Sequence, residues 1–193
     1  MWQVCTPTFT LLHTSKYSKT LISKTNKQKD FKKEAKLPFG QVPALQINDG
    51  KLIAQSKAIE RHLARTFNLF GSSVLEELEI DSVSEGIEDV WTKYRAAKYY
   101  AHATEKEEKL RTFGSETLPL WLEKLEKILE GNKHGVLVGE RLSYADVSLF
   151  HLLDSLEREH VEAAINDKPL LQKHKAQIES IPALKHYLTI RQN

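Results

Sequence analysis

The chain has 193 residues, of which 40% are hydrophobic and 28% are charged, and its formal net charge is +2. This length allows one domain or two small ones. No run of about 18 apolar residues is present, so we expect no membrane span, and a net charge so close to zero argues against a dedicated nucleic-acid surface. Cys5 is the only cysteine, which excludes an internal disulfide and favours a reducing compartment, so we expect a cytoplasmic protein.

The first residues of the chain predict little regular structure. Residues 1–36 carry eight lysines and only two acids, Asp30 and Glu34. The lack of acids before Asp30 leaves a mitochondrial presequence as an alternative, but the basic residues are all lysine and show no amphipathic stripe. Residues 1–29 are therefore a candidate for disorder.

A short hairpin and a helix are predicted next. Residues 42–48 alternate weakly between apolar and polar, and Asn48-Asp49-Gly50 is a strong hairpin signal before the returning strand, Lys51–Ala54. From Ser56 onward, apolar residues recur at helical spacing, at Ile59, Leu63 and Phe67. Residues 68–73 contain one glycine and two serines, which predicts a linker.

The remainder of the chain has helical patterns. We predict helices over residues 74–102 and 116–130, the second ending at Gly131. Residues 135–138 are the one candidate strand in this part. The sequence therefore predicts a small mixed domain over residues 1–67 and an all-helical domain over 74–193.

A third helix is predicted to begin at Ser143 with a capping box. In that arrangement Ser143 accepts the backbone N–H of Asp146, and the Asp146 carboxylate accepts the N–H of Ser143. The following residues, 147–156, are apolar on more than one side, which indicates a central helix. Pro169 and Pro182 punctuate the short helices that follow.

Several motifs resemble those of one family. The runs LPFGQVPAL at residues 37–45 and AQSKAI at residues 54–59 closely resemble sigma-class glutathione transferases, a group similar to haematopoietic-type prostaglandin D synthases and to the S-crystallins. Residues 138–146 look like the capped core helix of that family, and residues 181–184 resemble the run before its final helix. The resemblance covers about residues 30–193.

The resemblance implies both a fold and a function. The fold is an α+β thioredoxin-like N-terminal domain, with an incomplete opening βαβ unit, followed by an all-α C-terminal domain, and the protein is a homodimer. The function is conjugation of glutathione, as co-substrate and without a metal, to small hydrophobic electrophiles in detoxification and glutathione metabolism. Two alternatives stay open: a catalytically impaired glutathione-binding or structural protein like the S-crystallins, and an isomerase of the prostaglandin D synthase type.

The resemblance also assigns a glutathione site. The Val42–Pro43 bond is implied to be cis, so that the backbone of Val42 pairs with the cysteinyl unit like an added strand. Gln55 and Ser56 are implied to hold the γ-glutamyl carboxylate. Independently, Ser56 begins a predicted helix whose free N–H groups and dipole attract an anion, although a serine at this place is often only a cap. The other implied glutathione-binding residues are Gln41, Phe31 and either Lys33 or Lys36, the last two as candidates for the glycyl carboxylate.

Two features of the predicted helix over residues 74–102 are assigned in the same way. Asp89 is implied to reach across the dimer to the amino group of the partner's glutathione, whereas the alternative is a solvated acidic face. The tyrosines of this helix are candidate wall residues for the electrophile, namely Tyr94, Tyr99 and Tyr100.

The thiol-activating residue is unknown. The thiolate is the nucleophile of such a transferase, and in the sigma class a tyrosine hydroxyl near the end of the first strand stabilises it. No motif of that kind precedes Asp30. Tyr17 is the one tyrosine upstream of the glutathione loop, and other hydroxyls are available at Thr14, Ser15 and Ser18. Three explanations stay open: an alternative first exon or faulty gene model, a protein that binds glutathione without activating it, or a substitute hydroxyl.

Overall fold

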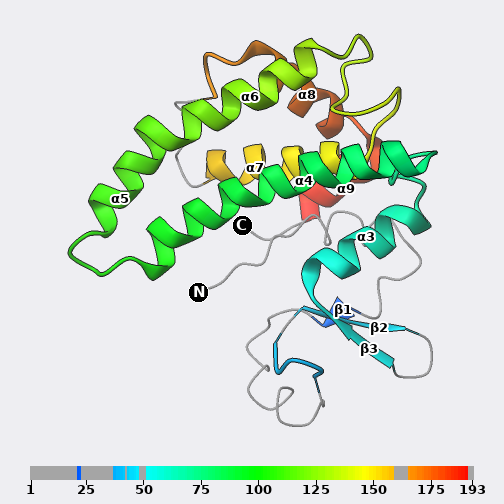
Figure 1. Cartoon of the computed structure of the whole chain (residues 1–193), viewed down its shortest axis with the longest axis horizontal. Helices are drawn as coiled ribbons and strands as arrows, with labels where there is room; N and C mark the ends of the chain where they lie inside the picture. The colour runs from blue at the N-terminus through cyan, green and yellow to red at the C-terminus, as the bar shows by residue number, and fades with distance from the viewer. Residues whose placement is uncertain (1–20, 23–36, 42, 48–50, 159–164, 191–193) are drawn as a thin grey trace. The chain divides into compact units, whose positions relative to one another are not determined.

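The computed structural model describes residues 21–22, 37–41, 43–47, 51–158 and 165–190. The chain divides into two compact units (Figure 1). The first contains the described residues up to Asn68 together with those from Pro182 onward, and the second is Leu69–Ile181. The predicted domain limits, 1–67 and 74–193, stay a prediction. No helix among the described residues has the length and apolar content needed to cross a membrane.

The first unit contains a small antiparallel sheet with the strand order β1-β2-β3. Its strands are β1 (Leu21–Ile22), β2 (Ala44–Ile47) and β3 (Lys51–Ala54). The register of the hairpin pairs Ala44 with Ala54 and Ile47 with Lys51. The predicted hairpin strands are therefore confirmed, while the turn at residues 48–50 and most of the opening βαβ segment lie outside the described residues.

Two helices belong to the first unit, α3 (Ser56–Thr66) and α9 (Pro182–Ile190). Helix α3 is amphipathic as predicted, because Ile59 and Leu63 are buried on one face. Glu60 is also buried on α3, and its carboxylate lies 3.3 Å from the ammonium of Lys57.

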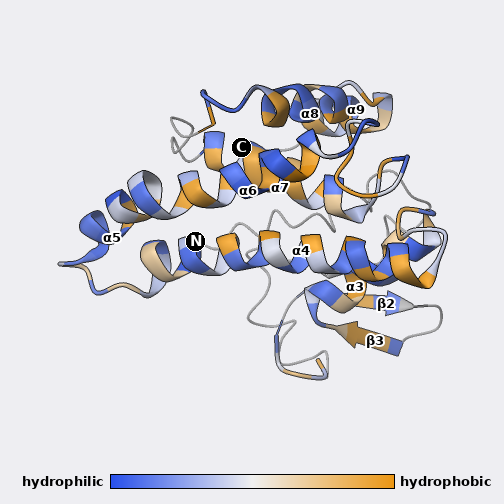
Figure 2. Cartoon of the chain, turned by 45° about the horizontal axis from the view of Figure 1, so that its top comes forward, coloured by the Kyte–Doolittle hydropathy of each residue, from blue (hydrophilic) through white to orange (hydrophobic). Residues whose placement is uncertain are grey.

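The second unit is entirely helical within the described residues. Its elements are α4 (Val74–Arg95), the π-helical turn η1 (Ala96–Tyr100), α5 (Lys106–Thr112), the π-helical turn η2 (Phe113–Thr117), α6 (Leu118–Glu130), α7 (Tyr144–Arg158) and α8 (Pro169–Glu179). Figure 2 shows hydrophobic and hydrophilic residues alternating along α4 and α6. Helix α7 contacts both α4 and α8. From Tyr144 to Leu156 only Val147 is not buried, which confirms the predicted central helix.

The structure differs from the predictions at three places. The helix expected over residues 74–102 changes to a π-helical turn after Arg95. Helix α5 was not predicted, because none of its residues is buried and it carries no apolar stripe. The strand expected at residues 135–138 is wrong: this segment is a loop, and the N–H of Leu137 donates to a carboxylate oxygen of Asp146 at 2.8 Å instead of to a neighbouring strand.

The start of α7 fixes the linker to the second unit. Half of the predicted capping box is confirmed, since the N–H of Ser143 donates to Asp146 at 2.7 Å. The next N–H, that of Tyr144, donates to the carbonyl of Leu69 at 2.7 Å. Phe70 is buried, with its ring centroid 6.2 Å from that of Tyr144. The linker from Leu69 onward is therefore part of the helical unit.

Candidate functional site

The hairpin brings the two glutathione motifs to one end of the sheet. Because Ala44 pairs with Ala54, the residues that precede β2 and follow β3, Pro43 and Gln55, lie at the same end of the hairpin. Gln41 and Gln55 are exposed there, and Pro43 and Ser56 are half-buried. The structure thus gathers four of the predicted site residues in one place.

The backbone of Gln55 has an unusual conformation, with φ 77° and ψ 111°. A non-glycine residue at positive φ is uncommon, and sparsely populated conformations of this kind cost about 1–3 kcal/mol. Among the described residues Asn68 is the only other non-glycine residue with positive φ. Strain of this kind concentrates at ligand sites, where the surrounding structure holds it. The sequence contains no signal for it, because glutamine has no preference for this region.

The N-terminus of α3 begins directly after this strained residue. Among the described residues no side chain caps it, since the N-cap residue Gln55 makes no side-chain cap hydrogen bond, and its first turn contains no acidic residue. The first N–H groups of a helix have no partner within the helix, and with the helix dipole they attract an anion. Ser56, the first residue of α3, adds a hydroxyl to these donors. The arrangement suits a carboxylate.

The loop before β2 is a tight turn. The N–H of Gly40 donates to the carbonyl of Leu37 at 3.1 Å, and Gly40 has φ 61°, a conformation that favours glycine. Phe39 stands on this turn with 64% of its surface exposed. The loop therefore presents Gln41 to solvent next to an exposed aromatic ring.

The structure does not reach every predicted residue. Four glutathione-binding candidates lie outside the described residues, namely Phe31, Lys33, Lys36 and Val42. The upstream hydroxyls considered for thiol activation lie outside them as well, so no catalytic residue is assigned. Asp89 lies on α4 in the second unit, where it is exposed and makes no hydrogen bond or ion pair with any described residue. Its neighbour Glu88 is paired with Arg95.

The candidate wall tyrosines fall into two groups. Tyr94 is buried, whereas Tyr99 and Tyr100 are exposed on η1, to 37% and 71% respectively. The structure adds Lys98, which the sequence reasoning missed. Its ammonium donates to the Tyr94 hydroxyl at 2.9 Å and lies 5.3 and 5.6 Å from the ring centroids of Tyr94 and Tyr99. The spacing of four residues between Tyr94 and Lys98 is the signal that could have indicated this contact.

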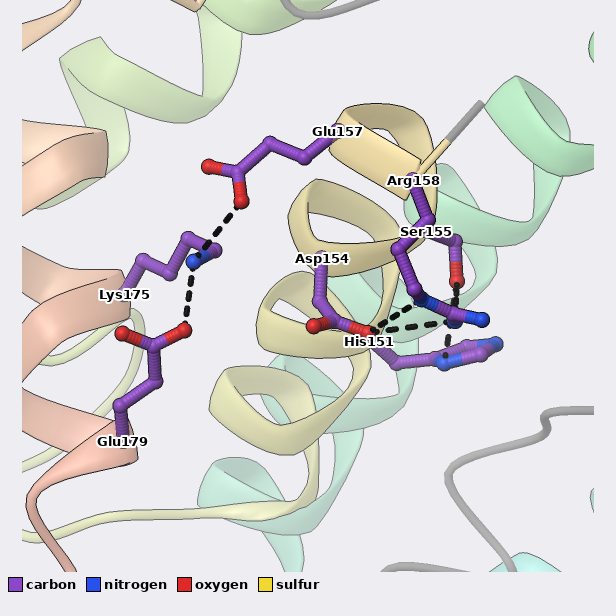
Figure 3. Close-up of polar contacts among 7 residues, drawn as sticks. All are labelled: His151, Asp154, Ser155, Glu157, Arg158, Lys175 and Glu179. Carbon is purple, nitrogen blue, oxygen red and sulfur yellow. Dashed lines mark hydrogen bonds and ion pairs between the residues drawn. The ribbon is translucent and has the colours of Figure 1, made fainter. Parts of the chain in front are cut away.

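A second polar cluster lies on α7 (Figure 3). Arg158 donates to Asp154 at 3.2 Å and to the Ser155 hydroxyl at 3.1 Å, and the ring nitrogen Nδ1 of His151 lies 3.5 Å from the same hydroxyl. The His151 ring stacks on Trp91 of α4 with a centroid distance of 5.2 Å. The side chains of this cluster are hydrogen-bonded to one another, and the stacking of His151 on Trp91 joins α7 to α4.

An ion-pair bridge joins α7 to α8 on the other side of the same helix end (Figure 3). The ammonium of Lys175 lies 3.0 Å from Glu157 and 2.5 Å from Glu179. Burial lowers the pKa of Lys175, but the hydrogen bonds to Glu179 and Glu157 outweigh it, and the net effect is a raised pKa. Among the described residues no three His, Cys, Asp or Glu side chains gather as a metal site would require.

Comparison with known proteins identifies the family of the chain. The chain matches the family model described as Glutathione S-transferase, N-terminal domain, over residues 15–65, and that described as Glutathione S-transferase, C-terminal domain, over residues 88–191. It is 35% identical over 162 residues to a glutathione S-transferase of Plasmodium yoelii yoelii, which covers 84% of this chain and 74% of the relative.

Solved structures give the same result. The Pi-class glutathione S-transferase of Onchocerca volvulus is 32% identical, with a TM-score of 0.77, and the match covers 94% of this chain and 84% of that one. The prostaglandin synthase D of Nilaparvata lugens shares the fold, with a TM-score of 0.83 and 22% identity over 100% of this chain and 96% of that one.

The predicted fold class is therefore confirmed: the chain is a transferase enzyme built from a thioredoxin-like N-terminal domain and an all-helical C-terminal domain. The two glutathione motifs, which lie at the same end of the hairpin, belong to the first domain, and the capped central helix belongs to the second. The chain belongs to the glutathione S-transferase family, which uses glutathione as its co-substrate.

Proposed function

We propose that this transferase conjugates the thiol of glutathione to small hydrophobic electrophiles, as a sigma-like member of its family. The observation that carries the proposal is the uncapped N-terminus of α3 directly behind the strained Gln55, at the same end of the hairpin as Pro43. There, Ser56 and the first N–H groups of α3 hold the γ-glutamyl carboxylate. The motif at residues 37–45 supports the sigma assignment and a cis Val42–Pro43 bond.

The cysteinyl and glycyl units of glutathione bind residues that precede this anion site in the sequence. The backbone of Val42 pairs with the cysteinyl unit, and Gln41 lies beside it. Phe31 packs against the ligand, and Lys33 or Lys36 binds the glycyl carboxylate. The thiol of bound glutathione first gives its proton to solvent. The thiolate then attacks the electrophilic carbon, a carbon–sulfur bond forms, and the bond from that carbon to the leaving group breaks, so that the leaving group departs with the bonding electron pair.

We also propose that the protein is a cytoplasmic homodimer. Leu78 and Asp89 are eleven residues apart on α4, so both lie on one face of the helix. The start of α4 exposes three neighbouring apolar side chains, Val74, Leu75 and Leu78, to 87%, 64% and 64%. A contiguous exposed apolar patch of this kind marks an interaction site. A partner on this face places its glutathione amino group near Asp89.

Two measurements test the function. We expect the protein to be retained on immobilised glutathione and to conjugate an activated aryl chloride. Replacement of Ser56 by alanine removes the hydroxyl from the anion site and should weaken glutathione binding about fivefold. The matched control is Ser82→Ala, which removes an exposed hydroxyl from α4 and should bind glutathione as the wild type does.

The outcomes separate the alternatives. Binding without turnover would identify a glutathione-binding protein like the S-crystallins. Isomerisation of a prostaglandin endoperoxide without aryl chloride conjugation would identify the isomerase. If Ser56→Ala binds as tightly as Ser82→Ala, the anion site is wrongly placed.

A further inference from the structure

An open groove lies in the helical unit, between the start of α4, the end of α6 and the loop that joins α6 to α7. Glu79 of α4 lines it with Lys127 and Ile128 of α6, and most of the loop residues 131–139 complete it. Its volume of about 540 Å³ lies within the range of small-molecule sites. All of its residues belong to the second compact unit.

The loop that lines this groove is held by side-chain hydrogen bonds. The Asn132 amide donates to the carbonyl of Gly139 at 2.9 Å, and its oxygen accepts the N–H of His134 at 2.9 Å. The N–H of Leu137 donates to the buried carboxylate of Asp146 at 2.8 Å. The groove is therefore preformed, which lowers the entropy cost of binding a ligand there.

The rim of the groove is basic. It carries the ammonium groups of Lys127 and Lys133 and the imidazole of His134, against a single acidic lining residue, Glu79. Lys133 makes no hydrogen bond or ion pair with any described residue. Lys127 is paired with Glu123 at 2.7 Å, but both side chains are exposed, and exposed pairs contribute little free energy. The two lysines are thus able to bind an anion.

Two features of the groove oppose an anion, and both are offset. The C-terminus of α6 carries partial negative charge, but its carbonyls at Lys127 and Leu129 already accept N–H groups of the loop, at 3.0 and 3.2 Å. Glu140 lies 3.7 Å from the His134 ring, and its side chain is exposed to solvent. Two lysines against one lining glutamate leave the groove with a net positive charge.

We propose that this groove binds a small phosphate monoester that carries hydroxyl groups, the chemistry shared by sugar phosphates and nucleotides. A phosphate monoester has close to two negative charges and three acceptor oxygens, so it can bind Lys127, Lys133 and His134 together. The carboxylate of Glu79 accepts hydroxyl hydrogens, and Ile128, which is 37% exposed, contacts the carbon skeleton. The ligand is bound and not converted, so the inference is independent of the proposed transferase function.

Isothermal titration calorimetry of the full chain tests the proposal, with ribose 5-phosphate, ribose and inorganic phosphate as probes. We expect ribose 5-phosphate to bind with a Kd of about 1 mM or lower, and ribose to show no binding at the same concentrations. Lys133→Met should weaken binding of the ester about fivefold, the upper range for an exposed ion pair. High ionic strength should weaken it as well.

Adenosine monophosphate distinguishes the two sources of the ester. Tighter binding than that of ribose 5-phosphate identifies a nucleotide, whose base adds contacts to the apolar floor of the groove. Equal binding identifies a sugar phosphate. Both results support the site.

A matched control is available on the same helix. Lys124 lies on α6 outside the groove, with its ammonium 4.7 Å from the ring centroid of Trp121. Lys124→Met changes the net charge as Lys133→Met does, and it should leave the Kd of the ester unchanged. Urea unfolding of each variant establishes that the fold is retained.

A second variant tests the recognition of hydroxyl groups. Glu79→Gln removes a negative charge from the groove and weakens the acceptor for hydroxyl hydrogens. It should therefore bind inorganic phosphate more tightly than the wild type does, while its preference for ribose 5-phosphate over inorganic phosphate falls. An unchanged preference overturns the role of Glu79.

Three outcomes overturn the site itself. They are absence of ribose 5-phosphate binding, an equal loss in Lys133→Met and Lys124→Met, and competition by saturating glutathione, which would place the ester at the N-terminus of α3. None of these measurements depends on turnover. Failure of the proposed function shows instead as absence of glutathione retention and of conjugation.

Discussion

The carboxylate of Asp146 and the imidazole of His174 meet inside the helical unit, with Oδ1 2.8 Å from Nε2 and both side chains almost fully buried. The same carboxylate accepts the N–H of Leu137 at 2.8 Å, and both the N–H and the hydroxyl of Ser143, at 2.7 and 2.8 Å. One side chain therefore ties together the loop before α7, the start of α7 and α8.

We predict that Asp146→Asn lowers the free energy of unfolding by about 3 kcal/mol, since an amide has one acceptor oxygen and leaves buried donors without a partner. Urea unfolding measures the loss. The control is Asp167→Asn, an exposed aspartate in the same unit, which should change stability by less than about 0.5 kcal/mol. Equal losses in the two variants would show that the buried carboxylate is not the junction.

The carboxylate of Glu76 makes stability depend on acid pH. It accepts the hydroxyl and the N–H of Ser72, and these bonds lower the pKa of Glu76 from its ordinary value of 4.5. A lowered pKa in the folded state stabilises the protein above pH 4.5, and this contribution is lost as the pH falls through the folded-state pKa. The difference in unfolding free energy between the wild type and Glu76→Gln should therefore be present at pH 7 and decline below pH 4.5.

The control for this prediction is Glu79→Gln, an exposed carboxylate one turn further along α4. An equal pH dependence in Glu79→Gln would show that the Ser72 hydrogen bonds are not its cause. A difference for Glu76→Gln that does not change between pH 7 and pH 3 would contradict the assignment.

The parts of the structure that the sequence predicts are those encoded by local patterns. The hairpin follows from turn chemistry and alternation, α3 and α6 follow from apolar spacing, and half of the capping box at Ser143 follows from residue type. The apolar run at residues 135–138 could not be assigned in this way, because a buried loop and a buried strand have the same composition. Its conformation depends on Asp146, which accepts the N–H of Leu137.

Other features of the structure depend on long-range contacts or on backbone conformations that no local sequence pattern indicates. The imidazole of His174 is 28 residues from Asp146 in the sequence, and the positive φ of Gln55 occurs at a residue type that rarely adopts it. The transition to a π-helical turn after Arg95 is likewise set by packing, which leaves Tyr99 exposed and Ala97 buried.

We expect the strained backbone conformation of Gln55 to serve glutathione binding and to lower the stability of the fold. Glycine adopts positive φ without penalty, so we predict that Gln55→Gly unfolds at an equal or higher urea concentration while its affinity for glutathione falls about fivefold or more. The matched control is Asn68→Gly, at the other described non-glycine residue with positive φ, which should not change glutathione affinity. Unchanged affinity in Gln55→Gly would remove this residue from the site.

Asp89 offers a test of the dimer and the glutathione site together. If Asp89 contacts the amino group of the partner's glutathione, Asp89→Asn should weaken glutathione binding by roughly three- to fivefold, the size of an exposed ion pair. Isothermal titration calorimetry measures the change, and Glu79→Gln on another face of α4 is the control.

The proposed contact crosses the dimer, so a variant that dissociates the dimer should also lose it. Leu78→Lys places a charge on the same face of α4. It should dissociate the dimer in sedimentation experiments and weaken glutathione binding by a similar factor. In that monomer Asp89→Asn should have no further effect. A full loss on adding Asp89→Asn to monomeric Leu78→Lys would mean that Asp89 acts within its own subunit.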